Sequence, residues 1–301
     1  MIDDLTYFWF WLLANGEDLR NVALALAGLS VPGALGWSAY AWQRAIQARA
    51  AGEQQARLAE RLAAVFAQLG SEQITMRIAA VHMLEQIARD NPDQHGPIMQ
   101  TLGAFVRECV PAPSGRYIGR RYEPPDAAQV FVPPRTDVQV ALTVLGRRKR
   151  DHDRPIDRPV LAGVNLSGYD LSEGDFTSAN FRGSYLCGTA LTGAKLAAAT
   201  FDYANLERAD FFGADCVGTS FAGAAAPGAR FAYARLGGAT LAEADLRGAD
   251  FTRAQLEGAN LLNADCEGAA LGEAVGLAGT PLLAHPASIP TLVFKSTNRR
   301  A

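Results

Sequence analysis

Four histidines and four cysteines are the side chains best suited to nucleophilic, acid–base or metal chemistry in this chain. The cysteines form no CxxC pair and have no ligand-like spacing from a histidine, so neither a zinc site nor a disulfide framework is predicted. His82 and Glu85 share one face of a predicted helix, but a lone pair of this kind is far more often structural than catalytic. The eight residues are His82, His95, His152, His285, Cys109, Cys187, Cys216 and Cys266.

The sequence also lacks the motifs of other chemistries, since no glycine-rich phosphate loop, nucleophile elbow or zinc signature is present. Asp and Asn are frequent between residues 165 and 265, but they recur at one position of a short repeat, which explains their spacing without an active site. We therefore predict no catalytic residue, no bound cofactor and no bound metal, in a protein that is not an enzyme. The cysteine pattern favours a reduced, cytoplasmic setting for the body of the chain.

A five-residue period of Leu or Phe runs from Leu161 to Leu271 and fills 20 of 23 central positions, with Ala two residues earlier in 16 repeats. An α-helix does not explain this period, because five residues rotate the chain by about 140° beyond a full turn and scatter the apolar side chains. Short extended segments do, because side chains two apart share a face. The small residue and the centre then point inward and the residue between them points outward. The last two residues turn the corner, and the second of them is Gly in 13 repeats.

Several repeats closely match a known consensus. The segments ANLER (204–208), ADLRG (244–248), ADFTR (249–253) and ANLLN (259–263) resemble the pentapeptide-repeat family, whose consensus is A(D/N)LXX. The resemblance implies a right-handed, square coil built from four pentapeptides, so that 23 repeats make nearly six coils. Stacked coils bury a continuous column of side chains, and each coil is stabilised by its neighbours. Three centres depart from Leu or Phe, namely Cys216, Ala226 and Cys266.

A membrane anchor is predicted before the repeats. Residues 22–42 form a run of 21 residues without a charge, long enough to cross a hydrocarbon core of about 30 Å as a helix. The alternative is a buried helix of a soluble bundle. Residues 5–14 are apolar but too short to span, and they form an interfacial segment or pack beside the span. Arginines are concentrated after residue 42, so the positive-inside tendency places the N-terminus outside and the rest in the cytoplasm.

Residues 43–150 are predicted to form a helical region. Apolar stripes predict one helix ending near Leu69 and a second along Ile74, Ile78, Val81, Leu84 and Ile87, which Asn91–Pro92 ends. A third helix is expected over about 97–109, a loop with six prolines over 111–135, and a short helix over 137–148.

Segments ahead of the repeats add a second resemblance. Residues 18–28, 68–92, 105–109 and 137–148 look like the regions before the repeats in bacterial membrane-anchored pentapeptide-repeat proteins. The resemblance implies a bacterial inner-membrane protein with a single span and a cytoplasmic C-terminal domain. The predicted fold is thus a membrane helix and a helical layer, followed by a right-handed quadrilateral β-helix. The domains are 1–42 (interfacial segment and transmembrane helix), 43–150 (helical region), 151–276 (β-helix) and 277–301 (C-terminal tail).

Basic residues in the helical region form the candidate interaction surface. Such runs are usually solvated, and on a membrane-held protein they also suit anionic lipid headgroups. Nucleic acid is disfavoured as a partner, since the net charge is −3 and aromatic residues between the basic ones are few. The candidate residues are Arg116, Arg120, Arg121, Arg147, Arg148, Lys149 and Arg150.

Three functions fit this organisation. The first is a membrane-anchored scaffold that binds an as yet unidentified protein partner. The second is a membrane effector or pore regulated by the solenoid, which requires a homo-oligomer because each chain has one span. The third is DNA mimicry, because the solenoid is similar to the quinolone-resistance pentapeptide proteins that bind DNA gyrase, a topoisomerase. Residues 160–275 hold 14 acidic against 7 basic residues, but basic residues interrupt the acidic columns.

Overall fold

The structure is a computed structural model that describes residues 55–113, 116–118, 121–123, 133–153 and 157–277, with residues 44, 52 and 53. The chain divides into two compact units, Met1–Ala63 and Ala64–Ala301. The predicted span at 22–42, the segment at 5–14 and the tail beyond residue 277 lie outside the described residues. Within the described ranges, no helix is long and apolar enough to cross a membrane.

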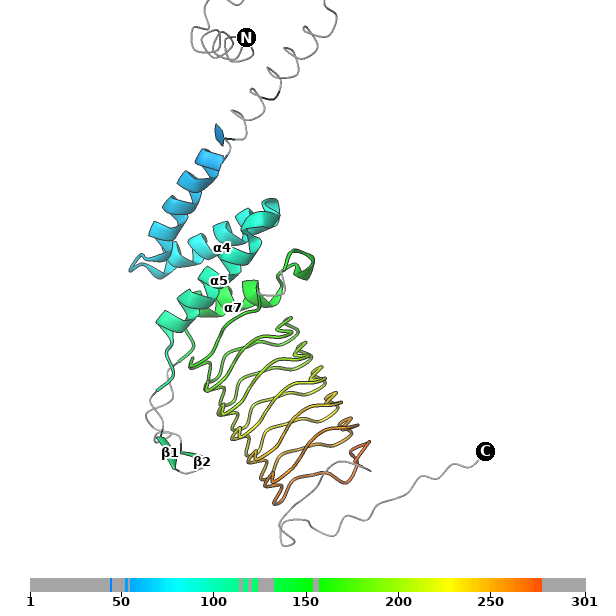
Figure 1. Cartoon of the computed structure of the whole chain (residues 1–301). Helices are drawn as coiled ribbons and strands as arrows, with labels where there is room; N and C mark the ends of the chain where they lie inside the picture. The colour runs from blue at the N-terminus through cyan, green and yellow to red at the C-terminus, as the bar shows by residue number, and fades with distance from the viewer. Residues whose placement is uncertain are drawn as a thin grey trace, which may run out of the picture. The chain divides into compact units, whose positions relative to one another are not determined.

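Three α-helices pack together in the second unit: α4 (Ile74–Asp90), α5 (Pro92–Cys109) and α7 (Thr136–Gly146), with the 3-10 helix η1 (Arg150–His152) after α7 (Figure 1). The break at Asn91–Pro92 is confirmed, because Asn91 is extended and α5 begins directly after it. Pro92 occupies the first turn, where the missing N–H leaves no helical bond unmade. The prediction that α5 begins near residue 97 was therefore wrong, and Pro97 lies inside the helix.

The buried face of α4 also differs from the predicted one. Val81 and Leu84 are fully buried as expected, but Ile74 is 49% exposed and the remaining apolar contacts come from Ala80 and Ala88. The buried face of α4 is thus centred on Val81 and Leu84 with two alanines beside them, while Ile78 and Ile87 are half-buried at its margin.

The other predicted segments were tested in part. The helix predicted after residue 43 is present at every described residue of 55–69, and its Val65 and Leu69 are buried. Inside the predicted loop lies a two-stranded antiparallel hairpin, β1 (Arg116–Ile118) and β2 (Arg121–Glu123), which the proline content did not reveal.

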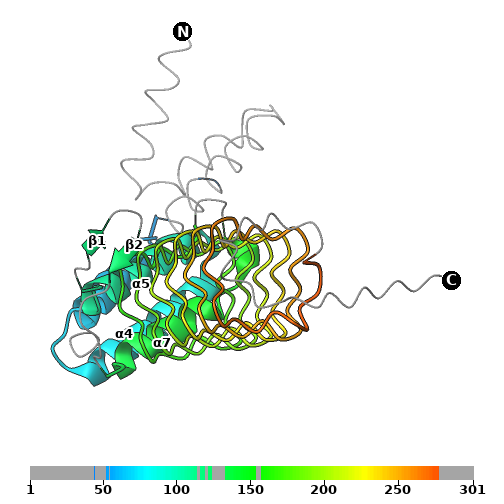
Figure 2. The ribbon, with the colours of Figure 1, turned by 90° about the horizontal axis from the view of Figure 1, so that it is seen from below.

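The repeats form a square solenoid whose coils stack along a rod (Figures 1 and 2). From Val160 to Gln255, the residue before each centre forms a parallel bridge with the residue 20 positions later, as in the series Asp175, Lys195, Asp215 and Arg235. This confirms the coil of four pentapeptides. Phenylalanine centres also stack from coil to coil, with ring centroids 4.8 Å apart for Phe181–Phe201 and 4.7 Å for Phe211–Phe231.

From the corner at Leu166 onward, each corner is a four-residue turn closed by a backbone hydrogen bond, such as that from the Ala194 N–H to the Leu191 carbonyl (3.1 Å). The third residue of the turn has a positive φ in thirteen glycines, Gly163 to Gly268, and in nine other residues. A positive φ at that position is the signature of a type II turn, which favours glycine. The predicted corner residue Thr192 is partly exposed, whereas Leu206 is fully buried.

The column of buried centres reaches Leu271 within the described residues. One period later the centre position is held by Gly276, which has a φ of +84° and no side chain to extend the column.

Candidate functional site

The helices α4, α5, α7 and η1, called the cap below, are hydrogen-bonded to all four sides of the first coil. Each side contributes the backbone of the residue before a centre. The Val160 carbonyl accepts from Arg107, the Asn165 N–H donates to the Val110 carbonyl (2.7 Å), the Asp170 N–H and carbonyl pair with the Gln139 side chain (3.1 and 2.7 Å), and the Asp175 N–H donates to the Gly146 carbonyl (2.7 Å).

These contacts replace a preceding coil. In the middle of the rod, such backbone groups pair with the coil before, and at its first coil they would be left unpaired. Glycines permit the close approach that the pairing needs: a Cβ added to Gly146 would lie 3.1 Å from the Cα of Gly174, and one on Gly103 would lie 3.3 Å from the Val160 carbonyl oxygen. The cap therefore bonds to the rod's backbone on every side, through its own backbone on two sides and through the side chains of Arg107 and Gln139 on the other two.

A buried ion cluster holds α4 to the start of α7. Asp137 is fully buried, and its carboxylate accepts hydrogen bonds from Arg77 (2.6 Å) and Arg135 (2.8 Å). Burial by itself raises the pKa of Asp137, but the hydrogen bonds from Arg135 and Arg77 outweigh it and hold the pKa below its usual value. Sequence patterns did not reveal this cluster, because Arg77 and Asp137 are 60 residues apart.

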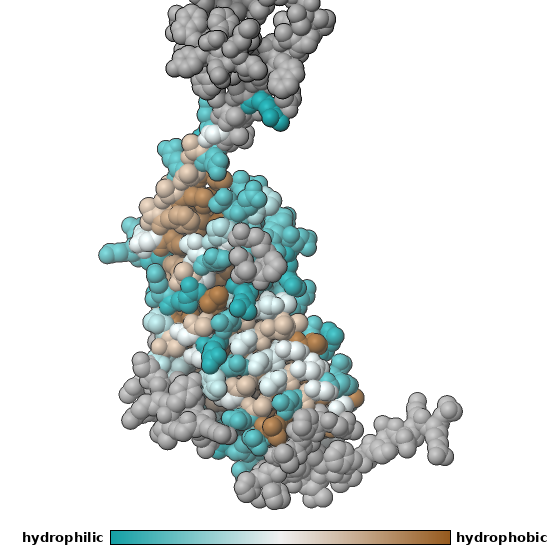
Figure 3. Space-filling model, viewed as in Figure 1, coloured by the Kyte–Doolittle hydropathy of each residue, from teal (hydrophilic) through white to brown (hydrophobic). Residues whose placement is uncertain are grey.

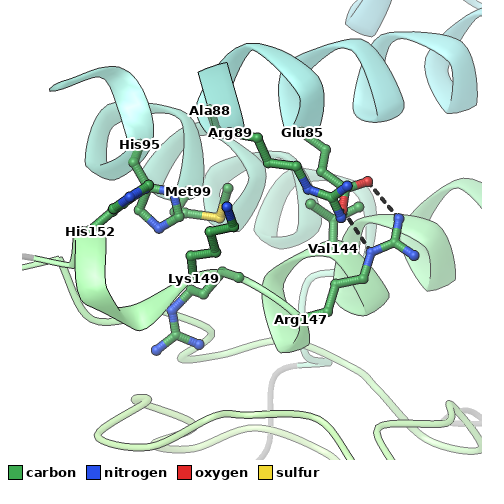
Figure 4. Close-up of a pocket in the computed structure, with 10 residues that line it drawn as sticks. Glu85, Ala88, Arg89, His95, Met99, Val144, Arg147, Lys149 and His152 are labelled. Atoms are coloured by element: carbon green, nitrogen blue, oxygen red, sulfur yellow. Dashed lines mark hydrogen bonds and ion pairs between the residues drawn. The ribbon is translucent and has the colours of Figure 1, made fainter. Parts of the chain in front are cut away.

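His82 and Glu85, which share a face of α4, are not hydrogen-bonded to each other in the structure. His82 Nδ1 lies 3.8 Å from the Glu85 carboxylate, beyond hydrogen-bond range. Glu85 instead receives two hydrogen bonds from Arg147 (2.7 and 2.5 Å) and one from Arg89 (2.6 Å), as Figure 4 shows. Glu85 thereby ties α4 to the end of α7.

The narrow cleft in Figure 4 is too small for a substrate. It encloses about 10 Å³, which is the space of a single water molecule. Among the residues that line it, buried His95 bonds through Nε2 to Asp153 (3.0 Å) and meets the ring of His152 edge-on at 5.5 Å. Asp153 also accepts from Arg148 (3.0 Å), so these groups bind each other rather than enclosing a ligand.

The predicted basic residues separate into two kinds. The Arg148 side chain is 1% exposed and donates to the carbonyls of Leu145 and Asp175, so it holds the fold and cannot meet a partner. Arg147 and Arg150 have side chains about half exposed (47% and 51%), and Lys149 is exposed between them. The side chains of Arg116, Arg120 and Arg121 lie outside what the structure describes.

Two further arginines, which sequence reasoning missed, belong to this surface. Two adjacent hollows share Arg148: Arg89 lines the first with Arg147 and Lys149, and exposed Arg158 lines the second with Arg150. These residues form what we call the basic edge: Arg89, Arg147, Lys149, Arg150 and Arg158.

The thiols are poor nucleophiles at neutral pH, since burial raises the pKa of Cys187 and Cys216 and raises that of Cys266 to about 11. For Cys109, burial likewise raises the pKa. In the portion of the chain that is described, no group of three His, Cys, Asp or Glu side chains is placed to hold a metal ion.

The repeats of the rod match a known protein family. The family model for pentapeptide repeats matches in eight copies, at residues 160–193, 190–224, 228–263 and 239–275. Residues 160–275 form a pentapeptide-repeat domain. This family's repeats build the right-handed quadrilateral β-helix expected from the sequence. A search of curated proteins found no match to the chain.

Solved pentapeptide-repeat structures are similar to the rod. One from the cyanobacterium Cyanothece 51142 shares 28% identity (TM-score 0.23) over 32% of this chain and 63% of its own. One from the Arabidopsis thaliana thylakoid lumen shares 29% (TM-score 0.22) over 36% and 62%. QnrB1, a plasmid-mediated fluoroquinolone resistance protein, shares 20% (TM-score 0.29) over 35% and 67%. The match spans less than two thirds of the first two structures.

Proposed function

We propose that this pentapeptide-repeat protein is a membrane-anchored scaffold that binds a protein partner and catalyses no reaction. The observation that carries the proposal is the joint between cap and rod. Because Gln139, Gly146 and Arg107 bind the first coil on separate sides, the basic edge and the faces of the rod keep fixed relative positions. A scaffold works by presenting surfaces in fixed geometry, and a rigid repeat rod is well suited to that task.

The surface of the rod supports the same proposal. In the view of Figure 3, hydrophilic residues are interspersed with weakly apolar ones along the rod. Surfaces of this mixed kind bind partners through a few central residues surrounded by polar contacts.

The membrane part of the proposal rests on the uncharged run at 22–42 and the arginines after it. We place the protein in a bacterial inner membrane, with one span and the rod in the cytoplasm. In that setting the basic edge contacts anionic headgroups, which attract each nearby Lys or Arg by about 1 kcal/mol.

Fractionation and reporter fusions test the anchor. The full chain should stay with membranes after an alkaline carbonate wash, and a variant lacking 22–42 should not. A C-terminal alkaline phosphatase fusion should be inactive, because that enzyme needs the periplasm. If the carbonate wash removes the full chain from membranes, the proposed anchor is wrong. If the alkaline phosphatase fusion is active, the rod lies in the periplasm and the proposed topology is wrong.

The lipid contact is tested in nanodiscs that contain the full chain, with or without anionic lipid. The double variant Lys149→Glu, Arg150→Glu should abolish the extra hydrogen-exchange protection that anionic lipid confers on η1. The matched control is Lys195→Glu, a charge reversal on the exposed face of the rod. Arg148 is unsuitable for such reversals, because its buried guanidinium caps the first coil. Equal protection in both lipid mixtures would exclude the contact.

DNA mimicry remains a second candidate because residues 160–275 hold 14 acidic and 7 basic residues. Mimicry needs continuous columns of negative charge, and two columns alternate in sign instead: Arg230 pairs with Asp210 (3.4 Å) and Arg235 with Asp215 (3.1 Å). Inhibition of DNA gyrase supercoiling by the purified chain would favour mimicry over the scaffold.

A further inference from the structure

The end of the rod opposite the cap carries an open backbone edge (Figure 1). Inside the rod, the N–H of each centre donates to a carbonyl of the next coil, as that of Leu246 does to the Asp265 carbonyl (2.8 Å). Among the described residues, the N–H groups of Leu261, Cys266 and Leu271 have no such partner. An edge of this kind is a template on which a further strand can form.

The core is less well covered here than elsewhere in the rod. Ala264 and Cys266, the two inward residues of one side, are 6% and 7% exposed, whereas the centres from Leu161 to Leu261 are at most 3% exposed. The repeat pattern itself supplies no cover, because the next three centre positions hold no large side chain. They are Gly276, Pro281 and Pro286.

This end of the rod also carries negative charge that its own arginines do not balance. Residues 243–277 contain seven acidic and two basic residues. Both arginines are already paired, since Arg247 and Arg253 each bond a carboxylate of the rod, at 2.6 and 3.0 Å. Glu267, at the corner after Cys266, is exposed and forms no ion pair with a described residue.

The sequence after Leu277 has the opposite charge and contains one segment suited to a strand. Residues 278–301 include three basic residues and no acidic one. Residues 291–295 are Thr-Leu-Val-Phe-Lys, in which Thr, Val and Phe have high β propensity. Side chains two apart share a face of a strand, so Leu292 and Phe294 give this segment one apolar face.

We propose that residues 291–295, called the closing strand below, add to the open edge on the side of Cys266 and thereby close the rod. Leu292 and Phe294 lie over Ala264 and Cys266, so the buried column gains one more layer of apolar side chains. The backbone of the closing strand accepts from the Cys266 N–H and donates to the Ala264 carbonyl, as the next coil does elsewhere in the rod.

The same register brings opposite charges together. Lys295 follows Phe294 as Glu267 follows Cys266, so the ammonium group of Lys295 lies over the Glu267 carboxylate. The intervening chain is long enough, because residues 278–290 span about 40 Å when extended, whereas one side of a coil has only five residues.

Charge also favours the closing strand over a second copy of the chain at this edge. Two rods stacked end to end would bring two negatively charged ends together, whereas the sequence after Leu277 brings positive charge to a negative end. A closed end prevents rods from associating through their edges, which is a general hazard of exposed strands. This inference goes beyond the proposed scaffold function, and it leaves the sides of the rod as the surfaces for a partner.

The test is hydrogen exchange of the full-length chain in mild detergent, followed by mass spectrometry. We expect the Cys266 amide to be protected in the wild-type chain and to exchange about tenfold or more faster in the double variant Leu292→Pro, Val293→Pro. Two prolines are needed because successive N–H groups of a strand face opposite sides. The Leu206 amide, in the middle of the rod, should stay protected in both chains and shows that the rod is folded.

His285→Pro is the matched control. Residue 285 lies 20 positions after Asp265 and would pair with the edge if the coil simply continued, so this proline should leave the Cys266 amide protected. The register has its own test by charge exchange. Glu267→Lys and Lys295→Glu should each speed exchange of the Cys266 amide several-fold at low salt, and the two changes together should restore the wild-type rate.

Three results would overturn the proposal. One is equally fast exchange of the Cys266 amide in the wild-type chain and the double-proline variant. Another is loss of protection in His285→Pro but not in the double-proline variant. The third is protection that rises with protein concentration, because that would place a second copy at the edge. If the paired charge exchange fails to restore the wild-type rate, the proposed register is wrong.

These outcomes are distinguishable from failure of the scaffold function. Exchange at the end of the rod, measured in detergent, does not depend on the membrane anchor or on the basic edge. A chain that is washed off membranes but protects its Cys266 amide would retain the closed end and lose the anchor.

Discussion

In the rod, every centre from Leu161 to Leu261 is at most 3% exposed, and all of them are apolar. The cap also has an apolar interior, but it buries Arg77, Glu85, His95 and Asp137 within it. The rod is thus stabilised by many equivalent apolar contacts between neighbouring coils, whereas the cap depends on a few charged contacts that occur once each. Disruption should therefore take different forms in the two regions.

The largest effect is expected from a charge in the rod's core. Leu206→Lys places an ammonium group with no partner in a fully buried column, which should cost more than about 4 kcal/mol or prevent folding. Thr192→Lys, at a partly exposed corner, should change the stability by no more than about 0.5 kcal/mol. Thermal unfolding of the two variants measures the difference, and equal melting temperatures would refute the repeat register.

The next largest effect is expected in the cap. Asp137→Asn leaves Arg77, whose side chain is 11% exposed, without its counter-charge and should cost about 3–5 kcal/mol. The pKa of Asp137 is lowered in the folded state, so its contribution is complete above the ordinary Asp value of about 3.9 and disappears as the pH falls through the lower folded value.

Urea unfolding at a series of pH values measures both effects. The wild-type chain should lose stability in that acidic window, and Asp137→Asn should lose less over the same interval. Asp151→Asn, an exposed carboxylate of η1, is the matched control and should behave like wild type. Parallel pH curves for wild type and Asp137→Asn would show that the ion cluster does not stabilise the cap.

A smaller effect is expected where cap and rod meet. Gln139→Ala removes both hydrogen bonds to the Asp170 backbone and should cost about 1 kcal/mol, since this contact is partly exposed. Hydrogen exchange should accelerate at the Asp170 amide and remain slow in the middle of the rod. Gln86→Ala, the same change at an exposed glutamine of α4 whose amide bonds to Asp90, is the control. Unchanged exchange at Asp170 would mean that the side chain of Gln139 does not cap the coil.

The smallest effect is expected from the ion pairs between stacked coils on the surface of the rod. The Arg235–Asp215 pair is exposed, with side chains 56% and 33% accessible, so it should contribute about 0.2–1 kcal/mol. A double-mutant cycle of Arg235→Ala and Asp215→Ala measures the coupling, which should decrease in high salt. A coupling energy several times larger would show that a single ion pair between coils contributes more to the stability of the rod than an exposed pair is expected to.

Sequence reasoning was most accurate where one local rule repeats many times. The register of centres and the corner position of Thr192 followed from the five-residue period, because each repeat supplies the same information again. It was least accurate in the cap, where the buried face of α4 and the start of α5 were misjudged. No repetition averages out the errors there, and tertiary contacts override the local apolar pattern.

By itself, the sequence determined the five-residue period and the inward or outward direction of almost every side chain between 161 and 271, because each repeat obeys the same local rule. The coil of four pentapeptides followed from the family resemblance, and the bridges between residues 20 apart confirm it. Only the tertiary structure decided which arginines are surface and which are interior. Arg147, Arg148 and Arg150 are alike in sequence, yet Arg148 alone is buried as a cap on the first coil. Arg148 is buried because carbonyl groups of the first coil, which have no preceding coil to pair with, lie next to the end of α7. The tertiary fold sets this proximity, so no local sequence pattern predicts it.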